Sequence, residues 1–176
     1  NGANMNEIHI ISTDLKKFKT KTMYLGKIEE RKKQYLYKDI PNIHFYGRCT
    51  DENFKQLTQY KGEPDRRTLL NNLSNYGNMV LLSTGENGTP LVLKEALMAG
   101  LPIVINKYSA NDLDLSLPFI DVIPDDKLND ISYISNIVDI NRNKKHLYNE
   151  IREYAIAKFS WDTLIKKYVD NINNIY

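Results

Sequence analysis

The chain has 176 residues, of which 41% are hydrophobic and 26% are charged, a balance typical of a folded domain. Its 24 basic and 22 acidic residues are mixed along the chain, which excludes the concentrated basic face of a nucleic-acid-binding protein. The single cysteine excludes an internal disulfide and a cysteine metal cluster and fits a reducing compartment such as the cytoplasm, and no apolar run is long enough for a transmembrane helix.

Strands are predicted where short apolar runs end in polar or glycine residues. In chain order we expect strands at residues 8–12, 42–46, 79–83, 103–105 and 119–123. The third of these runs is continuous, which is typical of a strand buried on both faces of a parallel sheet.

Helices are predicted between and after these strands from apolar residues at helical spacing. The last of them carries an apolar stripe that includes Trp161, Tyr168 and Ile172. The basic run Lys16, Lys17, Lys19 and Lys21 is interpreted as solvated loop and helix surface. We expect helices at residues 24–37, 51–60, 66–75, 90–99, 128–137, 143–158 and 161–175.

Strands that alternate with helices predict an α/β fold, a Rossmann-like parallel sheet with helices on both faces. We expect a single domain over residues 1–176, in which residues 1–7 are loosely held. Because the chain starts at Asn1 rather than at Met, we expect it to be a piece of a longer protein. Ligands of such sheets bind beyond the carboxyl ends of the strands, which is the predicted place of the loop after Ser83.

This loop and the helix after it form the most informative segment of the chain. Thr89 is predicted to cap the helix, Pro90 to occupy its first position, and Gly100 to end it in the left-handed conformation. The free backbone N–H groups at the positive end of the helix would then suit a phosphate or several sugar hydroxyls. Glu95 lies in the same helix, where its carboxylate can reach the same crevice.

Three motifs occur in a specific order along the chain. Residues 42–47 read Asn-Ile-His-Phe-Tyr-Gly, and residues 159–161 read Phe-Ser-Trp. Between these two motifs, a third motif is formed by residues at fixed spacing: Ser83, Gly88, Pro90, Glu95, Ala96, Gly100, Pro102, Ile103 and Val104. Together they resemble the donor-binding domain of retaining GT-B glycosyltransferases of the family 4 type (glycosyl transferases group 1). The resemblance implies the C-terminal half of a GT-B fold, with residues 159–176 as a helix that crosses to the other domain.

The resemblance also implies a role for each part of the site. Glu95 is expected to bind the ribose hydroxyls, because a carboxylate accepts two adjacent hydrogen bonds. Either Asn87 or Glu86 is expected to hold hydroxyls of the transferred sugar. The other implied positions are Gly88, Thr89 and Pro90 around the sugar, the backbone N–H groups of Leu91 and Val92 at the diphosphate, and Gly47, Arg48 and Cys49 near the base.

The sequence departs from the family pattern in two places. The family has two glutamates separated by seven residues, and counting back from Glu95 reaches Asn87, with Glu86 one position too early. An asparagine can hydrogen-bond sugar hydroxyls but supplies no negative charge. The strand with a Gly-Arg pair and a nearby lysine that grips the diphosphate, and the N-terminal acceptor domain before it, are not recognised in this chain.

The function implied by the resemblance is to bind the nucleotide-sugar donor of a hexosyltransferase. The whole enzyme would move a hexosyl group from a nucleotide diphosphate sugar to an acceptor with retention of configuration, and this half alone would transfer nothing. No metal or other cofactor and no nucleic-acid partner is implied, and peripheral membrane contact is left to the missing half. Two alternatives stay open: a GT-B epimerase or phosphorylase, and a degenerate module that assembles through its C-terminal stripe.

Overall fold

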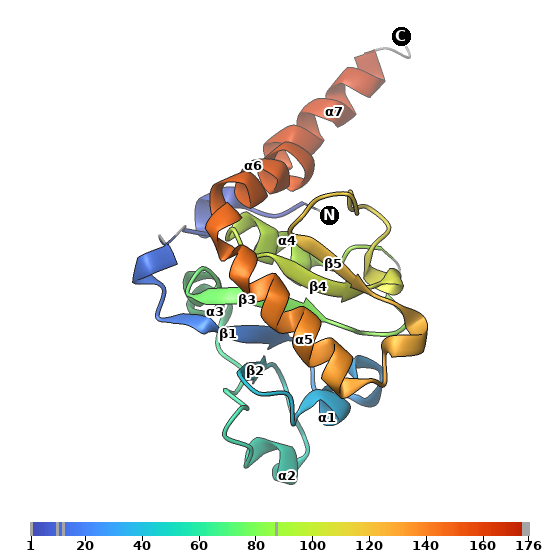
Figure 1. The fold of residues 1–176 in the computed structure, drawn as a ribbon. Coiled ribbons are helices and arrows are strands. Elements are labelled where there is room, and N and C mark those ends of the chain that lie inside the picture. Colours follow the sequence, from blue (N-terminus) through green and yellow to red (C-terminus); the bar gives the residue numbers. More distant parts are fainter. Residues whose placement is uncertain (1, 10, 12, 87, 174–176) are drawn as a thin grey trace.

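The computed structural model describes residues 2–9, 11, 13–86 and 88–173 (Figure 1). Its centre is a five-stranded sheet in the order β2-β1-β3-β4-β5, and every neighbouring pair is parallel. The predicted α/β parallel sheet is therefore confirmed. The strands are β1 (Phe18–Leu25), β2 (Ile43–Tyr46), β3 (Tyr76–Leu81), β4 (Ile103–Asn106) and β5 (Ile120–Ile123).

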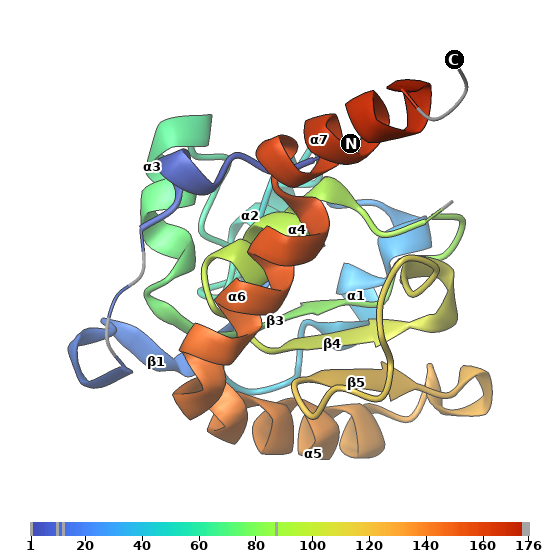
Figure 2. The same ribbon diagram turned by 90° about the horizontal axis from the view of Figure 1, so that it is seen from above.

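Helices cover both faces of this sheet, as Figure 2 shows from above. On one face, α5 packs against β1, β3, β4 and β5. On the other, α4 packs against β3 and β4, and α6 packs outside α4. The helices are α1 (Gln34–Tyr37), α2 (Glu52–Lys55), α3 (Arg66–Leu73), α4 (Leu91–Met98), α5 (Ile131–Arg142), α6 (Tyr148–Phe159) and α7 (Trp161–Asn173).

The predicted first strand is wrong. Residues 8, 9 and 11 lie in no strand, although the side chain of Ile8 is buried in the core. The first strand is instead β1, which contains Lys19 and Lys21 and also the residues Tyr24 and Leu25 that were expected to begin a helix. Its first half is less buried than its second, because β2 pairs with β1 only from Thr22 onward. Lys21 in this half donates to Asn42 Oδ1 at 2.7 Å, just before β2.

The predicted helices are present and most are shorter than expected, whereas the one expected over residues 128–137 begins and ends later, as α5. The helix expected over residues 24–37 is reduced to α1, and the one expected over residues 51–60 is reduced to α2. Asp51 caps α2 as predicted, because its side chain accepts hydrogen bonds from the backbone N–H groups of Asn53 and Phe54. Gly100 adopts the predicted left-handed conformation after α4, with φ at 73°.

The centre of the core is the pair β3 and β4, in which every residue is buried. A buried polar network fixes α5 against this sheet. Thr22 Oγ1 donates to Asn78 Oδ1 at 2.6 Å, and Asn78 Nδ2 donates to Asn141 Oδ1 at 2.9 Å. Arg142 Nη2 donates to Thr22 Oγ1 at 2.8 Å. Because each buried polar group has a partner in the network, the cost of removing it from water is offset.

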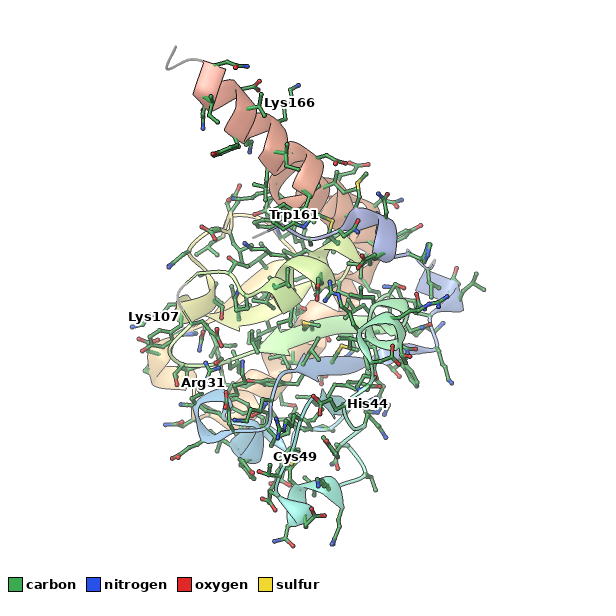
Figure 3. The ribbon with its side chains drawn as sticks, turned by 180° about the vertical axis from the view of Figure 1, so that it is seen from behind. Arg31, His44, Cys49, Lys107, Trp161 and Lys166 are labelled. Atoms are coloured by element: carbon green, nitrogen blue, oxygen red, sulfur yellow. The ribbon has the colours of Figure 1, made fainter. Side chains whose placement is uncertain are left out.

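The final helix α7 projects away from the body of the molecule (Figures 1 and 3). None of its residues is buried, and the stripe that includes Trp161 and Tyr168 is open to solvent. The N-terminal segment contacts the junction of α6 and α7, where Ala3 N–H donates to Phe159 O at 2.9 Å and Leu164 lies near Gly2. No helix in the described part of the chain is long and apolar enough to cross a membrane.

Candidate functional site

The strand order creates a crevice between β1 and β3. After β1 the next strand in the chain, β2, lies on one side of β1, and the strand after that, β3, lies on the other side. The loops that leave the carboxyl ends of β1 and β3 therefore diverge, which is where α/β sheets of this order bind ligands. A hollow of about 300 Å³ lies here, and we call it the switch-point hollow.

The switch-point hollow brings together five of the predicted site residues. Gly47 and Arg48, the candidates for base binding, lie across it from Leu91, Val92 and Glu95, the candidates for diphosphate and ribose binding. These residues come from the end of β2 and the first two turns of α4. The sequence placed these five candidates in two segments that are some forty residues apart, and the structure brings both segments to one hollow.

Gly47 shapes the wall of this hollow near β1. Its φ is 133°, and a Cβ atom built on it would collide with the carbonyl group of Gly26. The backbone also binds across the same gap, because Gly26 N–H donates to Tyr46 O at 2.9 Å. Only glycine fits this close approach of two loops. Cys49, the third predicted base neighbour, is buried in the core and is not part of the hollow's lining.

Glu95 is the buried acid of the site, with only 2% of its side chain exposed. Its Oε1 accepts a hydrogen bond from Arg66 Nη2 at 2.8 Å. Burial raises the pKa of Glu95, and the charge of Arg66 opposes that rise without cancelling it. The sequence did not single out Arg66, because nothing in the local pattern links two residues that lie 29 positions apart.

The start of α4 differs from the prediction by one residue. Pro90 is the N-cap, with no side-chain hydrogen bond to the helix, and Leu91 is the first helical residue. The predicted cap by Thr89 is therefore wrong. The Thr89 side chain is buried, and its Oγ1 has no hydrogen-bond partner within the described part of the chain. The first N–H groups of a helix have no intrahelical acceptor, so the backbone at Leu91 and Val92 is available to a ligand.

Glu86 is held by the segment that follows β1. Its Oε1 accepts hydrogen bonds from Ser83 Oγ at 2.7 Å and from Lys32 Nζ and Arg31 Nη1, both at 3.1 Å. Burial acts to raise the pKa of Glu86, but the hydrogen bonds from Ser83 and Lys32 and the nearby positive charges outweigh it, so the pKa is lowered. Asn87 lies outside the described residues.

The loop between β3 and α4 is further shaped by two glycines and a tyrosine. Gly85 and Gly88 have φ values of 81° and 105°, in the left-handed region that favours glycine. The hydroxyl of Tyr24 donates to Lys32 O and accepts from Leu82 N–H, so this one side chain joins the segments after β1 and β3. The predicted sugar-binding residues Gly88, Thr89 and Pro90 belong to this loop and are not in the lining of the hollow.

Charged side chains of both signs line the switch-point hollow. The buried acid Glu95 and Glu63 are accompanied by three cationic side chains, Lys27, Arg48 and Arg66. Arg48 has no side-chain partner among the described residues, whereas Lys27 pairs with Glu29 at 3.3 Å. No three side chains of His, Cys, Asp or Glu in the described ranges come together as a metal site.

The fold and the hollow together define a parallel α/β domain with a ligand crevice at its switch point.

No family model matches the sequence, and no curated protein matches it. Among solved structures, sucrose-phosphate synthase from Thermosynechococcus elongatus has a TM-score of 0.71 at 17% identity, over 99% of this chain and 51% of that one.

Two further solved structures show the same likeness. Anabaena HepE in complex with UDP has a TM-score of 0.73 at 15% identity, over 99% of this chain and 56% of that one. TarM from S. aureus has a TM-score of 0.63 at 19% identity, over 87% of this chain and 35% of that one. These neighbours are GT-B glycosyltransferases, so the chain has the fold of part of a GT-B enzyme and spans about half the length of the first two.

Proposed function

We propose that this chain is the donor-binding half of a retaining glycosyltransferase, which transfers a hexosyl group from a nucleotide diphosphate sugar to an acceptor. The observation that carries the proposal is the switch-point hollow, in which Arg48, Glu95 and the free start of α4 meet. The acceptor would bind to an N-terminal GT-B domain. We therefore expect this half to bind the donor and to transfer nothing by itself.

Each part of a nucleotide sugar has a matching group in the hollow. Glu95 supplies a carboxylate for two ribose hydroxyls, and Gly47 and Arg48 line the part of the hollow that the base would occupy. The N–H groups of Leu91 and Val92 and the positive end of α4 suit the diphosphate. The buried and unpartnered Oγ1 of Thr89 lies next to them in sequence and supplies one more group for a bound phosphate or sugar hydroxyl.

Catalysis in the whole enzyme would rest on stabilising the leaving group. As the bond from the sugar to the diphosphate breaks, negative charge grows on the diphosphate oxygens. N–H groups already oriented at the start of α4 stabilise that charge without having to reorganise. We propose no metal for this step, since the loop beside the hollow offers no acidic pair.

The transferred sugar would lie against Gly88, Thr89 and Pro90. Asn87 stands where the family pattern has a glutamate, and Glu86 is engaged by Lys32 and Arg31. The three hydrogen bonds that Glu86 accepts among the described residues all end on Oε1, so Oε2 is the oxygen that would meet a sugar hydroxyl. Asn87 is proposed as the other sugar-binding residue on its spacing from Glu95 alone.

A uridine nucleotide is the first donor to test. Solved complexes of the structural neighbour HepE contain UDP, or UDP-glucose. We propose that this chain also binds a uridine diphosphate sugar. Among the lining residues, the aliphatic Leu25, Leu69 and Val92 are compatible with a flat base.

A second candidate is supported by α7. Its apolar stripe is exposed, with Tyr168 at 68%. This is the feature expected of a degenerate GT-B module that serves assembly. Such a module keeps the fold and has no need to bind a nucleotide.

Calorimetric titration of the chain with UDP, GDP and ADP separates these candidates. The donor-binding proposal predicts saturable binding of one of the three and at least about tenfold weaker binding by Glu95→Gln. Glu153→Gln is the matched control, because Glu153 is an exposed glutamate on α6, outside the hollow. A folded chain that binds none of the three nucleotides contradicts donor binding and supports the assembly module.

A further inference from the structure

Arg66 contacts the buried acid of the switch-point hollow from a fixed position. It is the first residue of α3, and Asp65 fixes that helix start by accepting hydrogen bonds from Thr68 N–H at 2.9 Å and Thr68 Oγ1 at 2.6 Å. From there the Arg66 guanidinium reaches Glu95 Oε1 at 2.8 Å. The contact thus joins α3 to α4 across the wall of the hollow.

The geometry uses only one of the two oxygens of Glu95. Among the described residues, Oε1 accepts the hydrogen bond from Arg66, and Oε2 accepts none. Glu95 also lines the hollow. A buried carboxylate needs a partner to stay ionised. The partner of Glu95 bonds Oε1, so Oε2 has no hydrogen bond among the described residues.

We propose that Arg66 is a positioning residue for nucleotide recognition: it keeps Glu95 ionised and oriented so that Oε2 receives the ribose hydroxyls. This inference rests on the proposed donor-binding function and assigns the specificity for ribose to the pair rather than to Glu95 alone. Arg66 itself is 56% exposed, and it also lines a second hollow of about 590 Å³ together with Glu7 and His9.

The charged groups around Glu95 come from five other parts of the chain. Arg66 is on α3, Glu7 lies 3.7 Å from Arg66 in the N-terminal turn, and Lys27 and Arg48 follow β1 and β2. Glu63, in the loop before α3, completes the set. Burial and Glu7 act to raise the pKa of Glu95, and Arg66 acts to lower it. Removing Arg66 therefore shifts protonation of Glu95 to higher pH.

The test is the pH dependence of UDP binding by the wild-type chain and by Arg66→Met and Arg66→Lys, with 2′-deoxy-UDP as a second ligand. Arg66→Met is expected to weaken UDP binding about tenfold at neutral pH. As the pH is lowered, the variant should lose its remaining binding at a higher pH than the wild-type chain does. Arg66→Lys keeps the charge and is expected to restore most of the wild-type pH profile. The preference for UDP over 2′-deoxy-UDP should fall in Arg66→Met.

Arg67→Met is the matched control, because Arg67 is the next residue on α3 and lines only the second hollow. Circular dichroism checks that each variant is folded. If Arg66→Met fails to fold, the double variant Arg66→Gln with Glu95→Gln is compared with Glu95→Gln alone. Without the Glu95 carboxylate, loss of the Arg66 charge should leave the pH profile of UDP binding unchanged. An Arg66→Met profile identical to wild type overturns the role of Arg66 and leaves donor binding intact. Absence of nucleotide binding by the wild-type chain overturns donor binding, and the role of Arg66 with it.

Discussion

Lys32 Nζ lies 3.1 Å from Glu86 Oε1, and this ion pair fastens the loop after β3 to the segment after β1. Both side chains are mostly buried, and Thr84 N–H donates to Arg31 O at 2.8 Å beside them. The segments that follow β1 and β3 are therefore held together by charge as well as by the backbone.

Glu86→Gln should destabilise the fold by about 1–2 kcal/mol at neutral pH, because the amide keeps the shape but loses the charge of a partly buried pair. The pKa of Glu86 is lowered in the folded state, so its contribution is present above the ordinary glutamate pKa and is lost as the pH falls through the folded value. Urea unfolding measured from neutral to acidic pH checks this. Glu30→Gln, an exposed neighbour, is the control, and equal effects of the two changes would contradict the ion pair's role.

His44 should make the fold sensitive to mild acid. Burial, with the charges of Lys61 and Lys21, lowers the pKa of His44 from 6.5 to about 4, and its Nδ1 lies 2.9 Å from the Tyr76 hydroxyl. As the pH falls below 6.5, the unfolded chain takes up a proton that the folded chain does not, so stability is lost between pH 6.5 and about 4.

His44→Gln should flatten this part of the curve of unfolding free energy against pH. His146→Gln serves as the control, since His146 is on the surface and outside the Tyr76 cluster. The comparison uses the slope with pH rather than the absolute stability, because the glutamine also changes the contact with Tyr76. An unchanged slope would show that His44 is protonated in the folded state as readily as in the unfolded chain.

Gly47→Ala should cost about 3 kcal/mol or more, because the new Cβ collides with Gly26 O in addition to the left-handed backbone strain. Gly62→Ala is the matched control. Its φ is 85°, but no atom lies within 4 Å of the added Cβ, so only the backbone cost of about 1 kcal/mol remains. Denaturant unfolding of the two variants measures the difference, and equal losses would mean that the two loops do not approach as described.

Tyr168→Ser should change the free energy of unfolding by less than about 0.5 kcal/mol, because the side chain projects from α7 into solvent. Phe159→Ala, at the buried end of α6, should cost about 3–5 kcal/mol. Figure 3 shows Trp161 at the base of α7, between these two environments. A large loss from Tyr168→Ser in the isolated chain would reveal packing of the stripe against another copy.

The sequence predicted the segment from Ser83 to Ile105 almost in register, because glycine and proline mark its boundaries. Gly100 ends α4 as expected, and Pro102 comes directly before β4. The strand β1 was missed because its half-buried first half carries lysines. The shortness of its neighbour β2 is a tertiary feature that the local pattern does not contain.

The site residues divide in the same way. Glu95, Leu91 and Val92 were predicted because they belong to one continuous motif, and Gly47 and Arg48 because they follow an expected strand. All five line the switch-point hollow, and their binding roles stay predictions. The partners of these residues were not found. Arg66 meets Glu95, and Lys32 meets Glu86, only because strands distant in sequence become neighbours in the sheet.

The most direct test of the account is an NMR titration of the isotope-labelled chain with UDP. If the switch-point hollow is the donor site, the backbone amides of Gly47, Leu91 and Val92 should shift together and saturate, and Glu95→Gln should weaken that response. Saturable shifts confined to other surfaces, such as the second hollow around Asn71, would contradict it, as would a folded chain whose amides do not respond to UDP, GDP or ADP.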